Sequence, residues 1–156
     1  TEGSALPPRP ILITFDDGNL DNYTTAFPIM QKYGFTGVLY IVDNYIGADK
    51  YMTVYQIKEM ASAGWEVGSH SGNHVDLTAI EMQRQRHEIV DSRMFLKKEL
   101  GLPILTFAHP YGVSNHSVLN YAELSGYIAG MAETRLGSVT VLSPCRNASA
   151  SRILPS

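Results

Sequence analysis

The sequence contains one cysteine, Cys145, and it has no long apolar run and no excess of basic residues. A single cysteine excludes an internal disulfide and a zinc site built from several thiolates. No apolar stretch approaches the ~18 residues of a membrane-spanning helix, so no transmembrane segment is predicted. The formal net charge is −3, and without a basic excess a nucleic-acid partner is not expected. A content of 44% hydrophobic and 17% charged residues instead favours a packed core.

A chain of 156 residues fits one domain of ordinary size. Residues 1–10 include three prolines, which disrupt regular structure, and they are predicted to form a linker or N-terminal extension. Residues 11–156 are predicted to form the domain itself, without an internal repeat.

Apolar, β-branched runs alternate along the chain with stretches of helical periodicity. The main strand candidates are 11–15, 36–42, 65–69 and 104–108, and the weaker ones are 127–131, 139–142 and 152–154. Helices are predicted over 22–33, 53–63, 78–100 and 117–125. This alternation indicates parallel βαβ units in an α/β fold, either an open doubly wound sheet or a barrel.

Two of the predicted helices begin at a capping-box pattern, Thr53 with Gln56 and Thr78 with Glu81. The second pattern precedes the longest helix. Its buried stripe is predicted to hold Met82, Ile89, Leu96 and Leu100.

Asp16 and Asp17 end the first predicted strand and are followed by Gly18. Two adjacent carboxylates repel each other, so burying them raises a pKa or requires a cation. Neighbours in a strand point to opposite sides, which would let one carboxylate bind a metal while the other handles a proton. The alternative is an ordinary turn, since Asp-Asp-Gly is a common turn sequence.

His70 and His74 form a His-x-x-x-His pattern after the third predicted strand. Gly68 and Gly72 argue against a helix here and favour a loop that could still bring both imidazoles to one ion. The alternative is a pair of surface histidines. Together with one aspartate, the two histidines would form a two-histidine, one-carboxylate metal site with open positions. Zinc accepts this donor set, as does non-haem iron, and the spare carboxylate favours hydrolysis.

His109, Pro110 and Tyr111 follow the fourth predicted strand and precede Gly112. Proline and glycine there could fix an unusual backbone path that aims the Tyr111 N–H at a developing oxyanion. A tight turn that carries an aromatic lid is the alternative.

In this order, the three clusters resemble the motifs of the polysaccharide deacetylases of carbohydrate esterase family 4. Those enzymes carry Thr-Phe-Asp-Asp-Gly, His-Ser/Thr-x-x-His and an aromatic-rich Pro-Tyr-Gly motif. Residues 14–18 match the first motif in full and residues 70–74 match the second. The resemblance runs from about Pro10 to Ile153, nearly the whole chain. It is strongest to the subgroup that contains the poly-N-acetylglucosamine deacetylases, which often read Phe-Ala-Tyr-Pro-Tyr-Gly at the third motif.

The resemblance implies a distorted (β/α) barrel, which can be incomplete, and a divalent metal, usually zinc. It implies that Asp16 is the general base and that Asp17, His70 and His74 are the metal ligands. Tyr111 would contribute its N–H to the oxyanion hole and, with Pro110, would contact the substrate. The reaction would remove acetyl groups from a polysaccharide or oligosaccharide, most often from N-acetylglucosamine units. The protein would be secreted or associated with the cell envelope, although no signal peptide is visible.

The sequence departs from the family pattern at two points. The Arg that often precedes Pro-Tyr-Gly is replaced by the Ala108-His109 region, and we hypothesise that Arg152 supplies the missing cation near Asp16. The late Leu-x-His-Asp motif, whose His protonates the leaving group, is absent, because no histidine follows His116. His109 is a candidate acid by position only.

Two other functions stay open, and the departures motivate the second of them. The same site would serve an esterase that removes O-acetyl groups from xylan. A catalytically impaired carbohydrate-binding domain is the third possibility. Tyr45, Tyr51 and Tyr111 could stack on sugar rings, or they could be core or lid residues.

Overall fold

The computed structural model describes residues 10–133 and 140–144, and the account of the fold concerns these residues. One sheet runs through the molecule in the order β1-β2-β3-β4-β5-β6. The first five strands pair in parallel, and β6 pairs antiparallel with β5. The strands are β1 (Thr14–Phe15), β2 (Val38–Ile41), β3 (Glu66–Ser69), β4 (Thr106–Ala108), β5 (Ala129–Glu133) and β6 (Thr140–Pro144).

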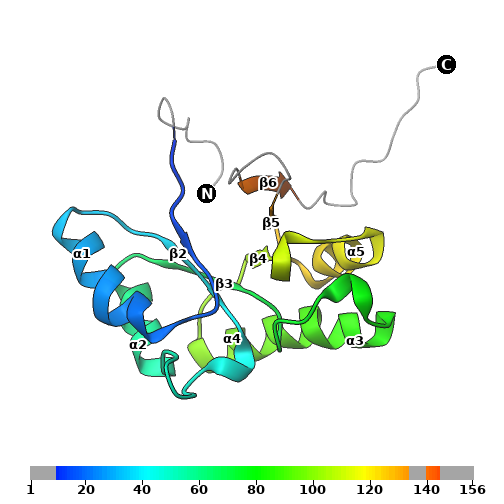
Figure 1. Ribbon diagram of the computed structural model, residues 1–156, viewed down its shortest axis with the longest axis horizontal. Coiled ribbons are helices and arrows are strands. Elements are labelled where there is room, and N and C mark those ends of the chain that lie inside the picture. Colours follow the sequence, from blue (N-terminus) through cyan, green and yellow to red (C-terminus); the bar gives the residue numbers. More distant parts are fainter. Residues whose placement is uncertain (1–9, 134–139, 145–156) are drawn as a thin grey trace.

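Helices connect the parallel strands, and Figure 1 shows α1 and α2 beside the early strands and α3, α4 and α5 beside the later ones. The α-helices are α1 (Phe27–Lys32), α2 (Val54–Ser62), α3 (Met82–Arg86), α4 (Ser92–Leu100) and α5 (His116–Ser125). The π-helical segment η1 (Asn22–Ala26) leads into α1. A second π-helical segment, η4 (His87–Asp91), connects α3 to α4. Short 3-10 turns are η2 (Asp43–Tyr45), η3 (Leu77–Ala79) and η5 (Pro110–Gly112). No helix in the described part of the chain combines the length and apolar character needed to cross a membrane.

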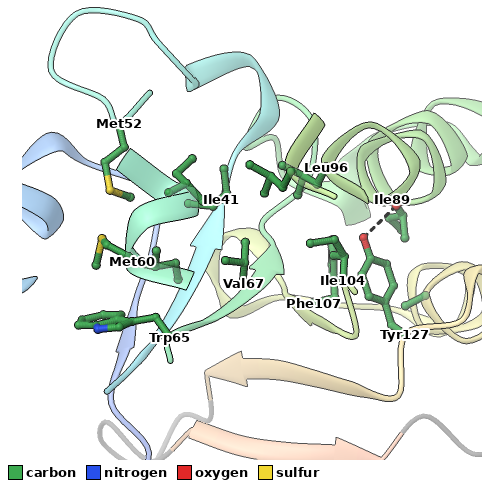
Figure 2. Close-up of a cluster of buried hydrophobic side chains, with 14 of the residues drawn as sticks. Ile41, Met52, Met60, Trp65, Val67, Ile89, Leu96, Ile104, Phe107 and Tyr127 are labelled. Atoms are coloured by element: carbon green, nitrogen blue, oxygen red, sulfur yellow. Dashed lines mark hydrogen bonds between the residues drawn. The ribbon is translucent and has the colours of Figure 1, made fainter. Parts of the chain in front are cut away.

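The helices cover one face of the sheet. Side chains of α1, α2, α4 and α5 join one buried cluster with Leu39 and Ile41 of β2, Val67 of β3 and Phe107 of β4. Figure 2 shows this core, from Met52 and Trp65 at one end to Tyr127 at the other. The alternate residues Val38, Tyr40, Ala108 and Met131 form a second, smaller cluster. Because side chains alternate along a strand, this second cluster lies on the opposite face.

The five parallel strands therefore curl into a half-barrel with the helices on its outer side. This confirms the expectation of a distorted, incomplete (β/α) barrel. An open doubly wound sheet would place helices on both faces, which does not fit the single helix-covered face.

Two details of the predicted helices were wrong. Thr78 does not begin the longest helix, because Asp76 accepts hydrogen bonds from the Thr78 N–H at 2.9 Å and from its hydroxyl at 2.7 Å. The chain first makes the turn η3, and α3 starts after Glu81. Met82 is 62% exposed and does not lie on the buried stripe.

The capping box at Thr53 and Gln56 is present, with the Thr53 N–H donating to Gln56 Oε1 at 2.8 Å. The weak strand candidates 127–131 and 139–142 correspond to β5 and β6. The candidate 152–154 lies outside the described residues.

Candidate metal centre

The polar clusters follow neighbouring parallel strands, so the sheet brings them to one edge. Asp16 and Asp17 follow β1, His70 follows β3, and Pro110 follows β4. Asp17 Oδ1 lies 3.7 Å from His70 Nε2 and 3.5 Å from His74 Nε2. One ligand atom from each of the three residues lies within 4.8 Å of the others. The three residues expected to bind a metal therefore converge.

The donor atoms of this cluster fit a cation. Asp17 Oδ1 is buried and has no hydrogen-bond partner among the described residues, and a buried carboxylate oxygen without a partner is costly. His70 Nδ1 lies 2.8 Å from the Ala108 carbonyl oxygen. A carbonyl oxygen can only accept, so Nδ1 carries the hydrogen and the lone pair of Nε2 faces Asp17. Burial lowers the pKa of His70, which favours this neutral form.

The backbone at this edge is strained. Positive φ angles occur at Asp17 (68°), Ser71 (71°), His74 (53°) and Tyr111 (58°), four of the five non-glycine cases in the described residues. Such conformations are uncommon outside glycine and concentrate at functional sites, where the surroundings hold them in place.

Asp16 is exposed beside the cluster, and its backbone carbonyl accepts the Gly18 N–H at 2.9 Å. Partial loss of hydration raises the pKa of the Asp16 carboxyl. The His70 and His74 imidazoles lower this pKa, and the Asp17 carboxylate raises it. The two adjacent carboxylates thus lie in different surroundings, one exposed and one with a buried oxygen turned towards two imidazoles.

Tyr111 belongs to the turn η5, which follows β4. Its ring lies 4.8 Å from the His74 ring, and its hydroxyl donates to the His74 carbonyl at 3.4 Å. The Tyr111 side chain is 62% exposed, whereas Pro110 is buried. The turn thus places an accessible aromatic ring beside one histidine of the cluster.

Tyr45 and Tyr51 pack together with ring centroids 4.5 Å apart. Partial burial raises the pKa of Tyr45, and the charges of Tyr51, Asp17 and Tyr111 add to this effect. A backbone bridge between Asn19 and Tyr51 also joins this aromatic pair to the chain that follows Asp17.

The remaining histidines do not join the cluster. His109 is 4% exposed, its ring packs edge-on against Phe107 at 5.1 Å, and burial lowers its pKa to about 4. A neutral imidazole that packs against the core residue Phe107 is poorly suited to protonate a leaving group, which argues against His109 as the acid. His87 is exposed and pairs with Asp91, and His116 is exposed at the start of α5. Arg152 lies outside the described residues.

Sequence reasoning missed a polar group that supports the loop between the two histidines. It comprises Asp43, Asn73, Glu88 and Ser92, of which Glu88 and Ser92 are buried. Hydrophobic periodicity gave no signal for this group, because Glu88 lies in the π-helical segment η4.

Comparison with known proteins agrees with this arrangement. The family model described as polysaccharide deacetylase matches residues 3–130. The chain belongs to the polysaccharide deacetylase family, the hydrolases of carbohydrate esterase family 4. The resemblance seen in the sequence is therefore confirmed.

Individual relatives cover most of this chain. YxkH from Bacillus subtilis is 35% identical over 121 residues, which are 78% of this chain and 43% of the relative. The Streptococcus pyogenes deacetylase PplD, solved in complex with acetate, has a TM-score of 0.75 and 31% identity, and the match covers 79% of this chain and 56% of that one. IcaB from Ammonifex degensii has a TM-score of 0.76 and 27% identity, with 80% and 60% covered. The chain spans about half the length of the curated relatives it matches.

Proposed function

We propose that this domain removes acetyl groups from an N-acetylated polysaccharide of the N-acetylglucosamine type, using a divalent metal. One observation carries the proposal: Asp17 Oδ1 is buried, has no hydrogen-bond partner among the described residues, and lies 3.7 and 3.5 Å from the Nε2 atoms of His70 and His74. The relatives support the substrate class. A Bacillus cereus relative, 27% identical over 118 residues, is named peptidoglycan-N-acetylglucosamine deacetylase. A Staphylococcus epidermidis relative, 25% identical over 139 residues, is named poly-beta-1,6-N-acetyl-D-glucosamine N-deacetylase.

The metal would be held by Asp17, His70 and His74, and zinc suits their oxygen and nitrogen donors. A bound divalent cation would polarise an acyl carbonyl and lower the pKa of a bound water towards ~7. The Nδ1–H of His70 donates to the Ala108 carbonyl and so fixes the ring with Nε2 facing the site.

Asp16 would act as the general base that takes a proton from the attacking water. Its exposure at the edge of the cluster and its raised pKa suit a group that must reach water and accept a proton. Attack on the acetyl carbon would develop negative charge on the carbonyl oxygen, and the Tyr111 N–H would donate to that oxygen. Collapse of the tetrahedral intermediate would break the C–N bond while the leaving nitrogen takes the proton that Asp16 removed from the water, which would release acetate and the sugar amine.

Substrate contacts are proposed on both sides of the cluster. The exposed Tyr111 ring, next to the buried Pro110, would contact the sugar on one side, and the tilted pair Tyr45 and Tyr51 offers an aromatic surface beside the chain that follows Asp17. Arg152 would contribute a cation near Asp16. The proposed partner is an acetylated polysaccharide or oligosaccharide, and no nucleic acid is expected.

The catalytic domain is proposed to comprise residues 11–156, with residues 1–10 as a linker or N-terminal extension. The protein is proposed to be secreted or associated with the cell envelope, because its expected substrate is an extracellular polymer.

Acetate release from acetylated chito-oligomers and from acetylxylan by the metal-loaded protein tests the function. We expect release from the chito-oligomers. Asp16→Asn should keep its bound metal while acetate release falls about 10²- to 10⁴-fold, the usual contribution of a general base. Asp21→Asn is the matched control, because Asp21 is exposed on the helix that follows β1.

Two results would replace the proposal. Release from acetylxylan alone would identify an O-acetyl esterase. Sugar binding without release of acetate from either substrate would indicate a carbohydrate-binding domain. The absence of a histidine after His116 in the sequence motivates this alternative. An Asp16→Asn variant with full activity would remove Asp16 as the base.

A further inference from the structure

The loop that carries His74 has a backbone that must be held in place. Ser71 and His74 have φ angles of 71° and 53°, which cost energy in residues other than glycine. Within the loop, the His74 N–H donates to Ser71 Oγ at 3.0 Å. From the β2 side, the N–H groups of Asp43 and Asn44 donate to the carbonyls of Ser71 and Gly72 at 3.3 and 3.1 Å. These contacts do not involve the backbone N–H groups of Gly72 and Asn73 or the side-chain N–H₂ of Asn73, which need another partner.

That partner is Glu88, which lies in η4 and is 3% exposed. Its Oε2 accepts the Asn73 backbone N–H at 2.8 Å, and its Oε1 accepts the Asn73 side-chain amide at 2.9 Å. A Cβ added to Gly72 would lie 3.2 Å from Glu88 Oε2, so the carboxylate is packed tightly against the loop. Arg84 Nε is 3.9 Å from Oε1 and adds a weak ion pair. The buried charge is therefore compensated mainly by the loop.

The π-helical geometry of η4 explains how a helix residue reaches this loop. A π turn holds an extra residue and breaks the regular α-helical hydrogen-bond pattern, which leaves carbonyls available to other groups. The Glu88 carbonyl accepts the Gly72 N–H at 3.1 Å, and the Ile89 carbonyl accepts the Tyr127 hydroxyl at 3.2 Å. Figure 2 shows the second of these bonds. Glu88 thus binds the loop through both its main chain and its side chain.

We propose that Glu88 is a positioning residue for the metal centre and that it holds the Gly72–Asn73 segment so that His74 faces Asp17. This inference rests on the proposed metal site. Groups that orient ligands in this way typically change metal affinity about 10- to 100-fold when they are replaced.

Glu88→Gln tests the proposal because it keeps the shape of the side chain. The new amide can accept only one of the two Asn73 N–H groups, and its own N–H₂ must face the other. We expect the dissociation constant for Zn²⁺, measured by competition with a chelator, to rise about 10- to 100-fold. The absorption spectrum of the Co²⁺-loaded protein should change as well, because ligand geometry sets it. Glu81→Gln, an exposed change at the start of the same helix, should leave both measurements unaltered.

A double variant separates positioning from general stability. In Asn73→Asp with Glu88→Gln, the donor and acceptor roles are exchanged. The new amide can donate to the new carboxylate and accept the backbone N–H of position 73. In the wild-type structure, Asn44 Nδ2 donates to Asn73 Oδ1 at 2.6 Å. The second oxygen of the new carboxylate at position 73 can still accept this hydrogen bond. The number of charges in the pair is unchanged, so zinc affinity should return to within a few-fold of the wild-type value.

The outcomes distinguish the inference from the function beneath it. A wild-type chain that binds no metal overturns both. Metal binding that is lost in Asp17→Asn but unchanged in Glu88→Gln overturns the inference alone, as does a double variant that binds no better than Glu88→Gln. If Glu88→Gln does not fold, Asn73→Ala gives the same test from the loop side. It should weaken zinc binding several-fold, and unchanged affinity would overturn the proposal.

Discussion

Replacing Asp17 by Asn should abolish the stabilisation of the chain by metal while leaving the metal-free fold intact. The residue has a φ of 68°, and Asn tolerates this conformation as well as Asp does. The change removes the negative charge from an oxygen, Oδ1, that is buried without a partner in the described residues. In the absence of metal, the variant should therefore be at least as stable as the wild type.

The size of the metal effect follows from linkage. A ligand present at 100 times its dissociation constant stabilises the folded state by about 2.7 kcal/mol. For a domain of this size, 1 kcal/mol corresponds to about 2–4 °C in Tm. The wild-type protein should therefore gain about 5–11 °C when zinc is added at that concentration, and a chelator should reverse the gain.

Scanning calorimetry of chelator-treated protein, with and without zinc, measures this directly. The Asp17→Asn variant should show no gain at the same zinc concentration, whereas the exposed control Asp21→Asn should behave as the wild type does. A zinc-dependent gain in Asp17→Asn equal to that of the wild type would refute the reasoning and place the metal elsewhere.

Two further predictions concern the scaffold. Gly68→Ala should destabilise the fold by about 1–3 kcal/mol, the usual cost of overpacking, because the new Cβ would lie 2.6 Å from both Tyr40 Cε1 and Thr106 Oγ1; an unchanged midpoint in urea would contradict this. Burial raises the pKa of Asp43 to about 7 from 3.8, with Glu88 adding to the rise. The folded state therefore binds more protons than the unfolded state, so this group lowers stability as pH rises from 3.8 to about 7. In Asp43→Asn, the free energy of unfolding should decrease less steeply over this pH range. Urea titrations that show an equally steep decrease in the variant would rule out Asp43 as the cause of the pH dependence.

The candidate ligands converge in the structure because they follow strand ends. Asp17 and His70 each come directly after a short buried strand, and parallel strands bring their carboxyl ends to one edge. Local spacing and this general rule predicted that one aspartate and the two histidines would meet, and the resemblance to the family assigned Asp17 as that aspartate. The alternation of strands and helices predicted the α/β class but left the choice between an open sheet and a barrel open, and the resemblance to the family predicted the distorted, incomplete barrel that the structure shows.

Competition among local hydrogen bonds explains most of what the sequence did not predict. Thr53 and Thr78 carry the same capping pattern, but Asp76 engages both donors of Thr78 and delays the helix. The π turn η4 changes which residues of the preceding helix α3 share a face with Leu96 and Leu100, so a stripe drawn at α-helical spacing included Met82 and passed over Glu88. Neither effect appears in hydrophobic periodicity, because each depends on bonds to a specific polar neighbour.

The turn η4 also fixes the length of the helix that contains it. Deleting one residue between His87 and Asp91 would convert the π turn into an α turn. One part of the helix would then rotate by about 100° relative to the other, which is the angle of one residue in an α-helix. Glu88 could then no longer face the loop that carries His74 while Leu96 and Leu100 pack into the core. Within this segment the chain should therefore accept a change of residue type at the exposed His87 but no change of length.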